Sequence, residues 1–139
     1  NSVSLVTYNV NYHFINNDIV SILDSINADV ICLQETNAEW ETIIRTGLSN
    51  KYSFIDFKHS GRAGGFATLS KYPVINNNII NNKFGWFQAW AITVLKNQDT
   101  IQILNTHLKP KLTRKGVIGW NAYFKAEGIH IQEFEGFFN

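Results

Sequence analysis

The sequence predicts a mixed α+β domain in which an opening strand–helix–strand unit is followed by antiparallel sheet. Residues 30–34, Val-Ile-Cys-Leu-Gln, are four apolar residues and a glutamine, as expected of a strand buried on both faces. The apolar residues just before them recur at helical spacing, at Ile19, Ile22, Leu23 and Ile26. After residue 50 the chain changes to short strand-like segments separated by tight turns, which favours antiparallel pairing.

The first three elements should form a parallel crossover. Residues 3–8 mix β-branched and aromatic side chains and predict a strand that ends at Asn9. Asn17 and Asp18 suit a helix start, and Asn27 is expected to close that helix. A strand–helix–strand order favours two parallel strands joined by a right-handed connection.

The remaining elements follow in order. Residues 38–48 predict a short helix that stops near Gly47, and residues 121–138 predict a closing helix. Strands are predicted over 52–57, 66–70, 88–95 and 100–106, with short strand pieces at 74–75 and 79–80. Lys96-Asn97-Gln98-Asp99 should form the hairpin turn between the last two strands. No linker or repeat interrupts this order, so one domain is expected.

Composition excludes some classes of function and leaves others open. Among the 139 residues, 45% are hydrophobic and 17% are charged, which predicts a globular fold. The net charge of +1 gives no global attraction to nucleic acid. The single cysteine, Cys32, excludes an internal disulfide and should be buried. No transmembrane segment is predicted. Because Asn1 stands almost directly before the first strand, both a cytoplasmic location and export with a removed signal stay open.

Polar residues follow three of the predicted strands. They are Asn9 after the first strand, Glu35 after the buried strand, and His107 after the strand that ends in Asn105-Thr106. If these strands share a sheet, an amide, a carboxylate and an imidazole converge on one rim. Glu35 and Asn9 would then be ligands of Mg²⁺, with Mn²⁺ possible, because these ions prefer oxygen ligands. His107 would act as an acid or bond a phosphoryl oxygen.

Each of these features also has an ordinary structural explanation. Asn9 could cap a turn, Glu35 could mark where a strand meets water, and His107 could be a satisfied core histidine. Gly64-Gly65 lacks the pattern of a phosphate-binding loop and is expected to serve a backbone turn. Two further segments stay open. The aromatic stretch 84–90 could form a substrate wall or a membrane-facing lip, with about half of its rings in the core. The basic loop 109–115 could attract an anion or simply be solvated.

Four sequence blocks, in order and at the right spacing, carry a resemblance to a known family. They are Thr7-Tyr8-Asn9-Val10, the segment 28–35 ending in Leu-Gln-Glu, the segment 64–74 beginning Gly-Gly-Phe-Ala-Thr-Leu-Ser, and Leu104-Asn105-Thr106-His107-Leu108. Together they resemble the endonuclease/exonuclease/phosphatase superfamily, the deoxyribonuclease-I-like fold. The segment 85–90 and the basic loop after His107 further resemble a bacterial branch of it.

The resemblance implies the N-terminal half of a four-layer α/β/β/α sandwich with a metal-dependent phosphoesterase site at one rim. It implies that Glu35 is the Mg²⁺ ligand and that Asn9 lies near the metal and phosphate. It also implies that His107 contacts the scissile phosphate. These are the residues that the rim argument selects. Nuclease, inositol-phosphate phosphatase and sphingomyelinase activities all occur on this fold. The substrate therefore stays open between nucleic acid, inositol phosphate and a phospholipid head group.

The departures from the family pattern are equally informative. The family's later Gly-Asp-Phe-Asn and Ser-Asp-His motifs, which supply further metal-proximal groups and a general base, are absent from residues 1–139. The expectation is therefore a partial domain, inactive alone, whose longer parent is a metal-dependent phosphoric ester hydrolase. A second copy or a second chain could complete the sandwich. The alternative is a non-catalytic binding module that uses the aromatic stretch 84–90 and the basic loop 109–115.

Overall fold

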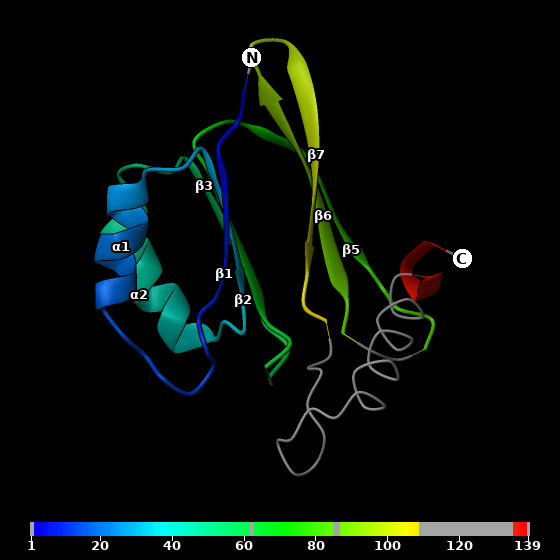
Figure 1. Ribbon diagram of the computed structural model, residues 1–139, viewed down its shortest axis with the longest axis horizontal. Coiled ribbons are helices and arrows are strands. Elements are labelled where there is room, and N and C mark those ends of the chain that lie inside the picture. Colours follow the sequence, from blue (N-terminus) through cyan, green and yellow to red (C-terminus); the bar gives the residue numbers. More distant parts are fainter. Residues whose placement is uncertain (1, 62, 85–86, 109–134, 139) are drawn as a thin grey trace, which may run out of the picture.

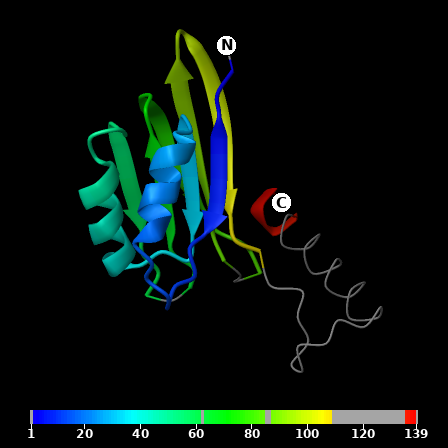
Figure 2. The same cartoon turned by 60° about the vertical axis from the view of Figure 1, so that its left-hand side comes forward.

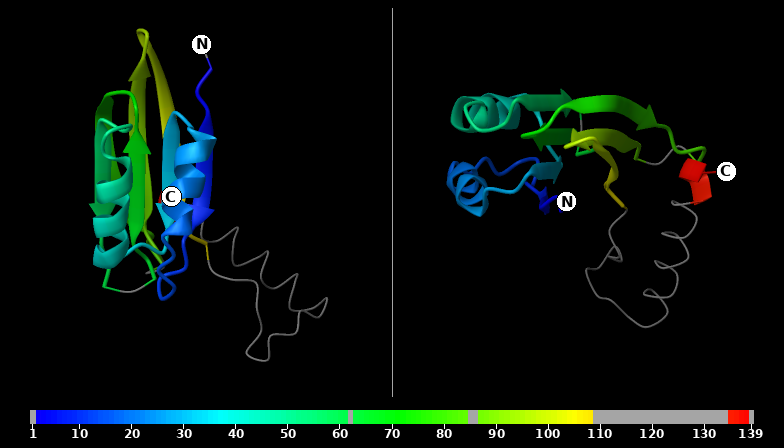
Figure 3. Two further views of the ribbon diagram at one scale, coloured as in Figure 1. Left: turned by 90° about the vertical axis from the view of Figure 1, so that its left-hand side faces the viewer. Right: turned by 90° about the horizontal axis from the view of Figure 1, so that it is seen from above.

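Two β-sheets packed face to face organise the computed structural model, which describes residues 2–61, 63–84, 87–108 and 135–138. The elements run in chain order β1 (Leu5–Asn9), α1 (Asp18–Ile26), β2 (Val30–Gln34), α2 (Ala38–Leu48), β3 (Phe54–Lys58), β4 (Phe66–Ser70), β5 (Val74–Ile80), β6 (Ala89–Lys96) and β7 (Asp99–Thr106). The first sheet has the order β1-β2-β4-β3 and the second the order β5-β6-β7 (Figure 1). Both helices lie over the outer face of the first sheet (Figure 2; Figure 3).

The predicted parallel crossover is confirmed. β1 and β2 are parallel, with Val6 paired to Ile31, and α1 connects them. Asn27 closes α1 in the left-handed region at φ 55°, and its N–H donates to the Leu23 carbonyl. The helix predicted over 38–48 is confirmed, since α2 runs from Ala38 through Gly47 to Leu48. Val20 of α1 packs against Gly47, so the glycine serves helix contact and not helix termination.

β2 is the central strand of the fold and is buried on both faces, as its sequence predicts. Ile31 and Leu33 pack into the cluster beneath the two helices. Val30 and Cys32 pack into the cluster between the sheets, together with Trp90 of β6. Burial raises the pKa of the Cys32 thiol to about 12, so the thiol stays protonated and inert.

The second sheet is a meander of antiparallel strands, also as predicted. Asn97 and Gln98 both have positive φ, 50° and 75°, which is the backbone of a tight two-residue hairpin turn. The strand pieces expected at 74–75 and 79–80 are one strand, β5, with a register irregularity between Val74 and Asn76. Asparagine is uncommon in strands, so the composition of the Asn-rich run does not predict one. The run is a strand because it pairs with β6.

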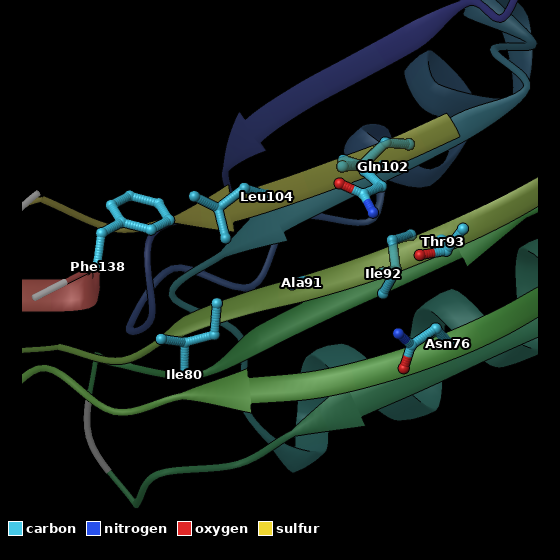
Figure 4. A pocket seen from close by; sticks show the side chains of 9 residues that line it. Asn76, Ile80, Ala91, Ile92, Thr93, Gln102, Leu104 and Phe138 are labelled. Atoms are coloured by element: carbon cyan, nitrogen blue, oxygen red, sulfur yellow. The ribbon is translucent and has the colours of Figure 1, made fainter. Parts of the chain in front are cut away.

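A groove of about 400 Å³ crosses the outer face of the second sheet (Figure 4). Ile80, Leu104 and Phe138 line its apolar end, and Asn76 lines its polar end. Residues 135–138 are helical, and they are the described part of the closing helix expected over 121–138; residues 121–134 lie outside the described part. Within the described part of the chain, no helix is long and apolar enough to cross a membrane.

A polar clasp ties the first strand to the start of β2, beside the β6–β7 hairpin. Asp29 Oδ2 accepts from the Ser4 N–H at 3.0 Å, and Lys96 Nζ lies 3.5 Å from the same oxygen. The Ser4 hydroxyl in turn accepts from the Asp29 N–H at 2.8 Å. The backbone hydrogen bond from Ser4, with a smaller contribution from Lys96, holds the pKa of Asp29 below its ordinary value of 3.8 despite some desolvation.

This clasp predicts a defined acid sensitivity. A carboxyl group with a lowered folded-state pKa stabilises the fold above its unfolded pKa and loses that contribution as the pH falls through the folded value. We expect Asp29→Asn to be less stable than wild type in urea unfolding at pH 7. The difference in the free energy of unfolding between wild type and Asp29→Asn should become smaller below about pH 4, where the carboxyl group begins to bind a proton in the unfolded state. A difference in unfolding free energy that is the same at pH 7 and below pH 4 would contradict the role of the Asp29 charge.

Candidate functional site

The carboxyl ends of β1, β2 and β7 lie at the same end of the molecule (Figure 1). Asn9, Glu35 and His107 therefore come together, as predicted. The supposition that all three strands share one sheet is wrong, because β7 belongs to the second sheet. Face-to-face packing of the sheets places the end of β7 against the end of β2, so the cluster straddles the seam between the sheets.

Glu35 is the centre of this cluster. Its Oε1 accepts from Asn9 Nδ2 at 2.9 Å and lies 3.2 Å from His107 Nε2. Its Oε2 accepts from the Tyr12 N–H at 3.3 Å. The side chains of Glu35 and His107 are 22% and 13% exposed, so the carboxylate is largely enclosed but still open to a ligand.

Asn9 performs two tasks at once. Its Oδ1 accepts from the Asn11 N–H at 3.0 Å, while its Nδ2 donates to Glu35. Asn11 has a positive φ of 61°, so the chain turns sharply at this point. The turn-capping interpretation of Asn9 and its place in the site are therefore compatible. The cap fixes the side chain that reaches the carboxylate.

The backbone at Glu35 is in an unusual conformation. Its φ is 59°, in the left-handed region that a non-glycine residue occupies at some cost. The following residue, Thr36, is held by its N–H bond to the Gly65 carbonyl at 3.3 Å. The Thr36 carbonyl lies so close to Gly65 that a methyl group there would overlap it. Gly65 thus serves the backbone, as expected, and it does so by supporting the turn that carries Glu35.

This contact predicts a strong effect of Gly65→Ala. Because the overlapping atom is a backbone oxygen, the turn at Glu35 and Thr36 must move, and we expect a loss of about 1–3 kcal/mol in the free energy of unfolding. Gly64→Ala is the comparison variant and should cost less, since its nearest neighbours are side-chain atoms at 3.1 Å that need to move by only a few tenths of an ångström. Equal urea midpoints for wild type and Gly65→Ala would contradict the close approach.

A buried amide pair joins the sheets directly behind the cluster. Gln34 Nε2 donates to Asn105 Oδ1 at 2.7 Å and to Thr7 Oγ1 at 2.9 Å. Asn105 Nδ2 donates to the carbonyls of Leu33 and Ala67, at 3.2 and 3.4 Å. We call Gln34 and Asn105 the inter-sheet amide pair. It fixes the end of β7, and hence His107, against the end of β2, and hence Glu35.

His107 has a second neighbour that sequence reasoning did not single out. The ring of Phe87 lies flat on the imidazole, with 4.7 Å between centroids and 5° between planes. The imidazole Nδ1 is buried and has no hydrogen-bond partner among the residues that the structure describes. His107 is therefore not the satisfied core histidine that was the ordinary alternative. Phe87 was grouped only with a general aromatic stretch, and no spacing rule links it to a residue twenty positions later.

The rest of the aromatic stretch includes one core ring and one exposed ring. Trp90 is fully buried between the sheets, whereas Phe84, which precedes β6, is 48% exposed. Trp86 and the basic loop 109–115 lie outside the described residues. Within the part described, the aromatic surface required by the alternative, non-catalytic interpretation consists of exposed Phe84 and half-buried Phe87.

The donor set at Glu35 fits Mg²⁺ but not a metal held entirely by protein ligands. Among the described residues, no three His, Cys, Asp or Glu side chains are placed to hold a metal ion. Mg²⁺ commonly binds one or two carboxylates and takes its other ligands from waters and substrate phosphates. Glu35 Oε2 accepts one described hydrogen bond, from Tyr12, and Asn9 Oδ1 accepts one, from Asn11, so each oxygen keeps a lone pair for a metal ion.

A pocket of about 450 Å³ lies beside the turn that follows Glu35. Its lining includes Tyr12, Thr36, Asn37, Glu39 and His59, whereas Glu35 itself does not line it. Tyr12 connects the pocket to the cluster, because its N–H donates to Glu35 Oε2.

The family to which this fold and cluster belong is shown by sequence comparison. The profile of the Endonuclease/Exonuclease/phosphatase family matches residues 6–110. The chain belongs to this family. Its members are hydrolases that act on phosphoesters, and they generally depend on divalent metal ions. No curated protein sequence matches the chain.

Solved structures agree in fold. Truncated TDP2 from Caenorhabditis elegans is 20% identical with a TM-score of 0.68, over 81% of this chain and 48% of that one. A family protein from Leptotrichia buccalis C-1013-b is 12% identical with a TM-score of 0.62, over 91% of this chain and 60% of that one. ANGEL2, a 2',3'-cyclic phosphatase solved with adenosine-2',3'-vanadate, is 17% identical with a TM-score of 0.60, over 77% of this chain and 41% of that one. The chain thus spans about half the length of these structures.

Proposed function

We propose that this chain is the first part of a Mg²⁺-dependent hydrolase of phosphate diesters or monoesters. The observation that carries the proposal is the cluster in which Asn9 and His107 both reach Glu35 Oε1, at 2.9 and 3.2 Å. A carboxylate, an amide and an imidazole in contact suit metal-assisted hydrolysis of a phosphoester, which is the class of reaction of the family that the chain belongs to. Residues 1–139 would form part of a larger domain, because the solved relatives are about twice as long.

Each side chain has a defined task in this proposal. Glu35 and Asn9 would hold the metal, and a bound Mg²⁺ supplies Lewis-acid polarisation of a phosphoryl oxygen. His107 offers an Nε2–H that can donate to a phosphoryl or leaving-group oxygen. The Tyr12 N–H fixes one carboxylate oxygen of Glu35, which keeps the other side of the group facing Asn9 and His107. The organic part of the ester would extend toward the pocket that Tyr12 and Thr36 line.

The metal ion in this proposal is Mg²⁺, with Mn²⁺ as a substitute, because both prefer oxygen ligands. The substrate class stays open between nucleic acid, an inositol phosphate and a phospholipid head group. A net charge of +1 disfavours a nuclease that depends on a broad basic surface.

The test is hydrolysis by the protein at its natural length. Bis(p-nitrophenyl) phosphate and p-nitrophenyl phosphate report diesterase and monoesterase activity, and an oligonucleotide, an inositol phosphate and phospholipid vesicles report the substrate class. We expect activity in Mg²⁺, loss in EDTA and recovery when Mg²⁺ is returned in excess. Turnover that EDTA leaves unchanged, or no turnover of any of these esters, would contradict the proposal.

A further inference from the structure

Phe87 reaches the candidate site from the segment that leads into β6. Its ring covers one face of the His107 imidazole almost in parallel, with 4.7 Å between centroids. A flat stack of this kind restricts rotation of the imidazole about its last side-chain bond, because any rotation would drive the rings into each other. The stack thus holds the plane of the imidazole and opposes a flip of the ring, while the contact of Nε2 with Glu35 Oε1 selects the edge that faces the carboxylate.

Gly64 supports the other side of this arrangement. A methyl group built at Gly64 would lie 3.1 Å from Phe87 Cδ1 and 3.4 Å from Cε1. Phe87 is therefore fitted between the backbone of residue 64 and the imidazole. Three segments that are far apart in the sequence meet here, and each residue limits the movement of the next.

The two ring nitrogens of His107 have very different surroundings. Nε2 lies 3.2 Å from Glu35 Oε1, whereas Nδ1 is buried and meets no hydrogen-bond partner within residues 2–61, 63–84, 87–108 and 135–138. A neutral imidazole carries one proton, and the carboxylate accepts a hydrogen bond only from a protonated nitrogen. The proton therefore belongs on Nε2, the nitrogen that faces the site.

We propose that Phe87 is a positioning residue for His107. Phe87 is clamped against Gly64 and holds the His107 imidazole with its Nε2–H directed at Glu35 and at the bound ester. The proposal rests on the proposed function only in giving the ester as the group that this N–H meets. Phe87 touches no reacting atom. It acts through the orientation and the tautomer of His107.

The first test uses NMR spectra of the metal-free protein labelled at its histidines, of which the sequence has four. With the imidazoles neutral, we expect the His107 ring nitrogens to show the Nε2–H tautomer and its ring protons to be shifted upfield by the face of Phe87. Phe87→Leu should remove the upfield shift and mix the tautomers, while Phe87→Tyr should keep both signatures. Phe138→Leu is the matched control, since that ring is 66% exposed at the groove on the outer face of the second sheet.

The second test asks whether Gly64 acts through Phe87. Gly64→Ala should change the His107 signals in the same direction as Phe87→Leu. In a Phe87→Ala background the same substitution should change them little, because the ring that it displaces is gone. Thermal melts confirm that each variant is folded. The proposal would be overturned if the His107 signals were identical in wild type and Phe87→Leu. It would also be overturned if Phe87→Tyr lost the upfield shift and the Nε2–H tautomer as completely as Phe87→Leu does.

A kinetic test separates this proposal from the proposed function. In the active protein of natural length, Phe87→Leu should lower kcat by about 10-fold or more with little change in KM. The loss should not exceed the roughly 10²–10⁴-fold rate enhancement that a positioned acid–base group contributes. Unchanged kcat would overturn the positioning role. If the protein hydrolyses no ester while the NMR signatures behave as expected, the proposed function fails and the clamp on His107 stands.

Discussion

Glu35→Gln is expected to reduce phosphoester hydrolysis by about 10²–10⁴-fold, because metal-based charge stabilisation contributes several kcal/mol and each 1.36 kcal/mol is tenfold in rate. The glutamine keeps the size of the side chain and one oxygen that can accept from Asn9 or Tyr12. Stability should therefore fall by no more than about 1 kcal/mol. The rate is measured in saturating Mg²⁺ with the protein of natural length.

The control for this variant is Glu135→Gln, the same chemical change at an exposed residue of the terminal helical turn. It should leave the rate unchanged. Activity that survives Glu35→Gln at near wild-type level would remove Glu35 from the mechanism. A large loss in both variants would indicate a general charge effect and not a metal ligand.

Asn105→Ala is expected to destabilise the fold by about 1–3 kcal/mol and to impair hydrolysis as well. Asn105 is 3% exposed, and its amide satisfies Gln34 on one side and the carbonyls of Leu33 and Ala67 on the other. Its removal unpairs buried groups between the sheets. It also frees the end of β7, which carries His107 toward Glu35.

The direction of the Asn105 amide gives a sharper version of this test. Asn105→Asp keeps the shape but turns the group that donates to two carbonyls into an acceptor, so it should be at least as destabilising as the alanine variant. Gln34→Ala should couple to Asn105→Ala by about 0.5–3 kcal/mol in a double-mutant cycle. Gln102→Ala, at an exposed residue of the same strand, is the control. An additive cycle would contradict the inter-sheet amide pair.

Much of the fold could be predicted because local patterns and tertiary structure agree. The apolar run at 30–34 becomes the central strand, and the helical spacing before it becomes α1, capped at Asn27. The hairpin turn at Asn97 and Gln98 was likewise predicted from its residues and the strands beside it. In each case the residues within one short segment decide the conformation, so that no distant contact is needed.

Errors arose where distant contacts decide the structure. The bounds of α2 agree with the prediction, but the packing of Val20 of α1 against Gly47 has no signal in the sequence. The Asn-rich run from 76 reads as an interruption, but pairing with β6 makes it part of one strand. Intrinsic preferences for strand are weak and depend on context, so the partner strand overrides them.

The candidate site divides in the same way. Asn9, Glu35 and His107 could be selected because each follows a predicted strand, and strand ends are where ligand sites of open sheets gather. The seam between the two sheets could not be predicted, since no local pattern assigns β7 to the first or the second sheet. Phe87 and the inter-sheet amide pair are visible only once that assembly is known.

The most direct measurement of the central claim is the effect of Mn²⁺ on the NMR spectrum of the protein of natural length. Mn²⁺ replaces Mg²⁺ at oxygen-ligand sites and broadens the signals of nearby nuclei. The account predicts that Asn9, Glu35 and His107 lose intensity first, that Asn97 at the β6–β7 hairpin turn is spared, and that Glu35→Gln abolishes the broadening. Broadening centred elsewhere, or broadening at the cluster that persists in Glu35→Gln, would contradict a metal site at Glu35.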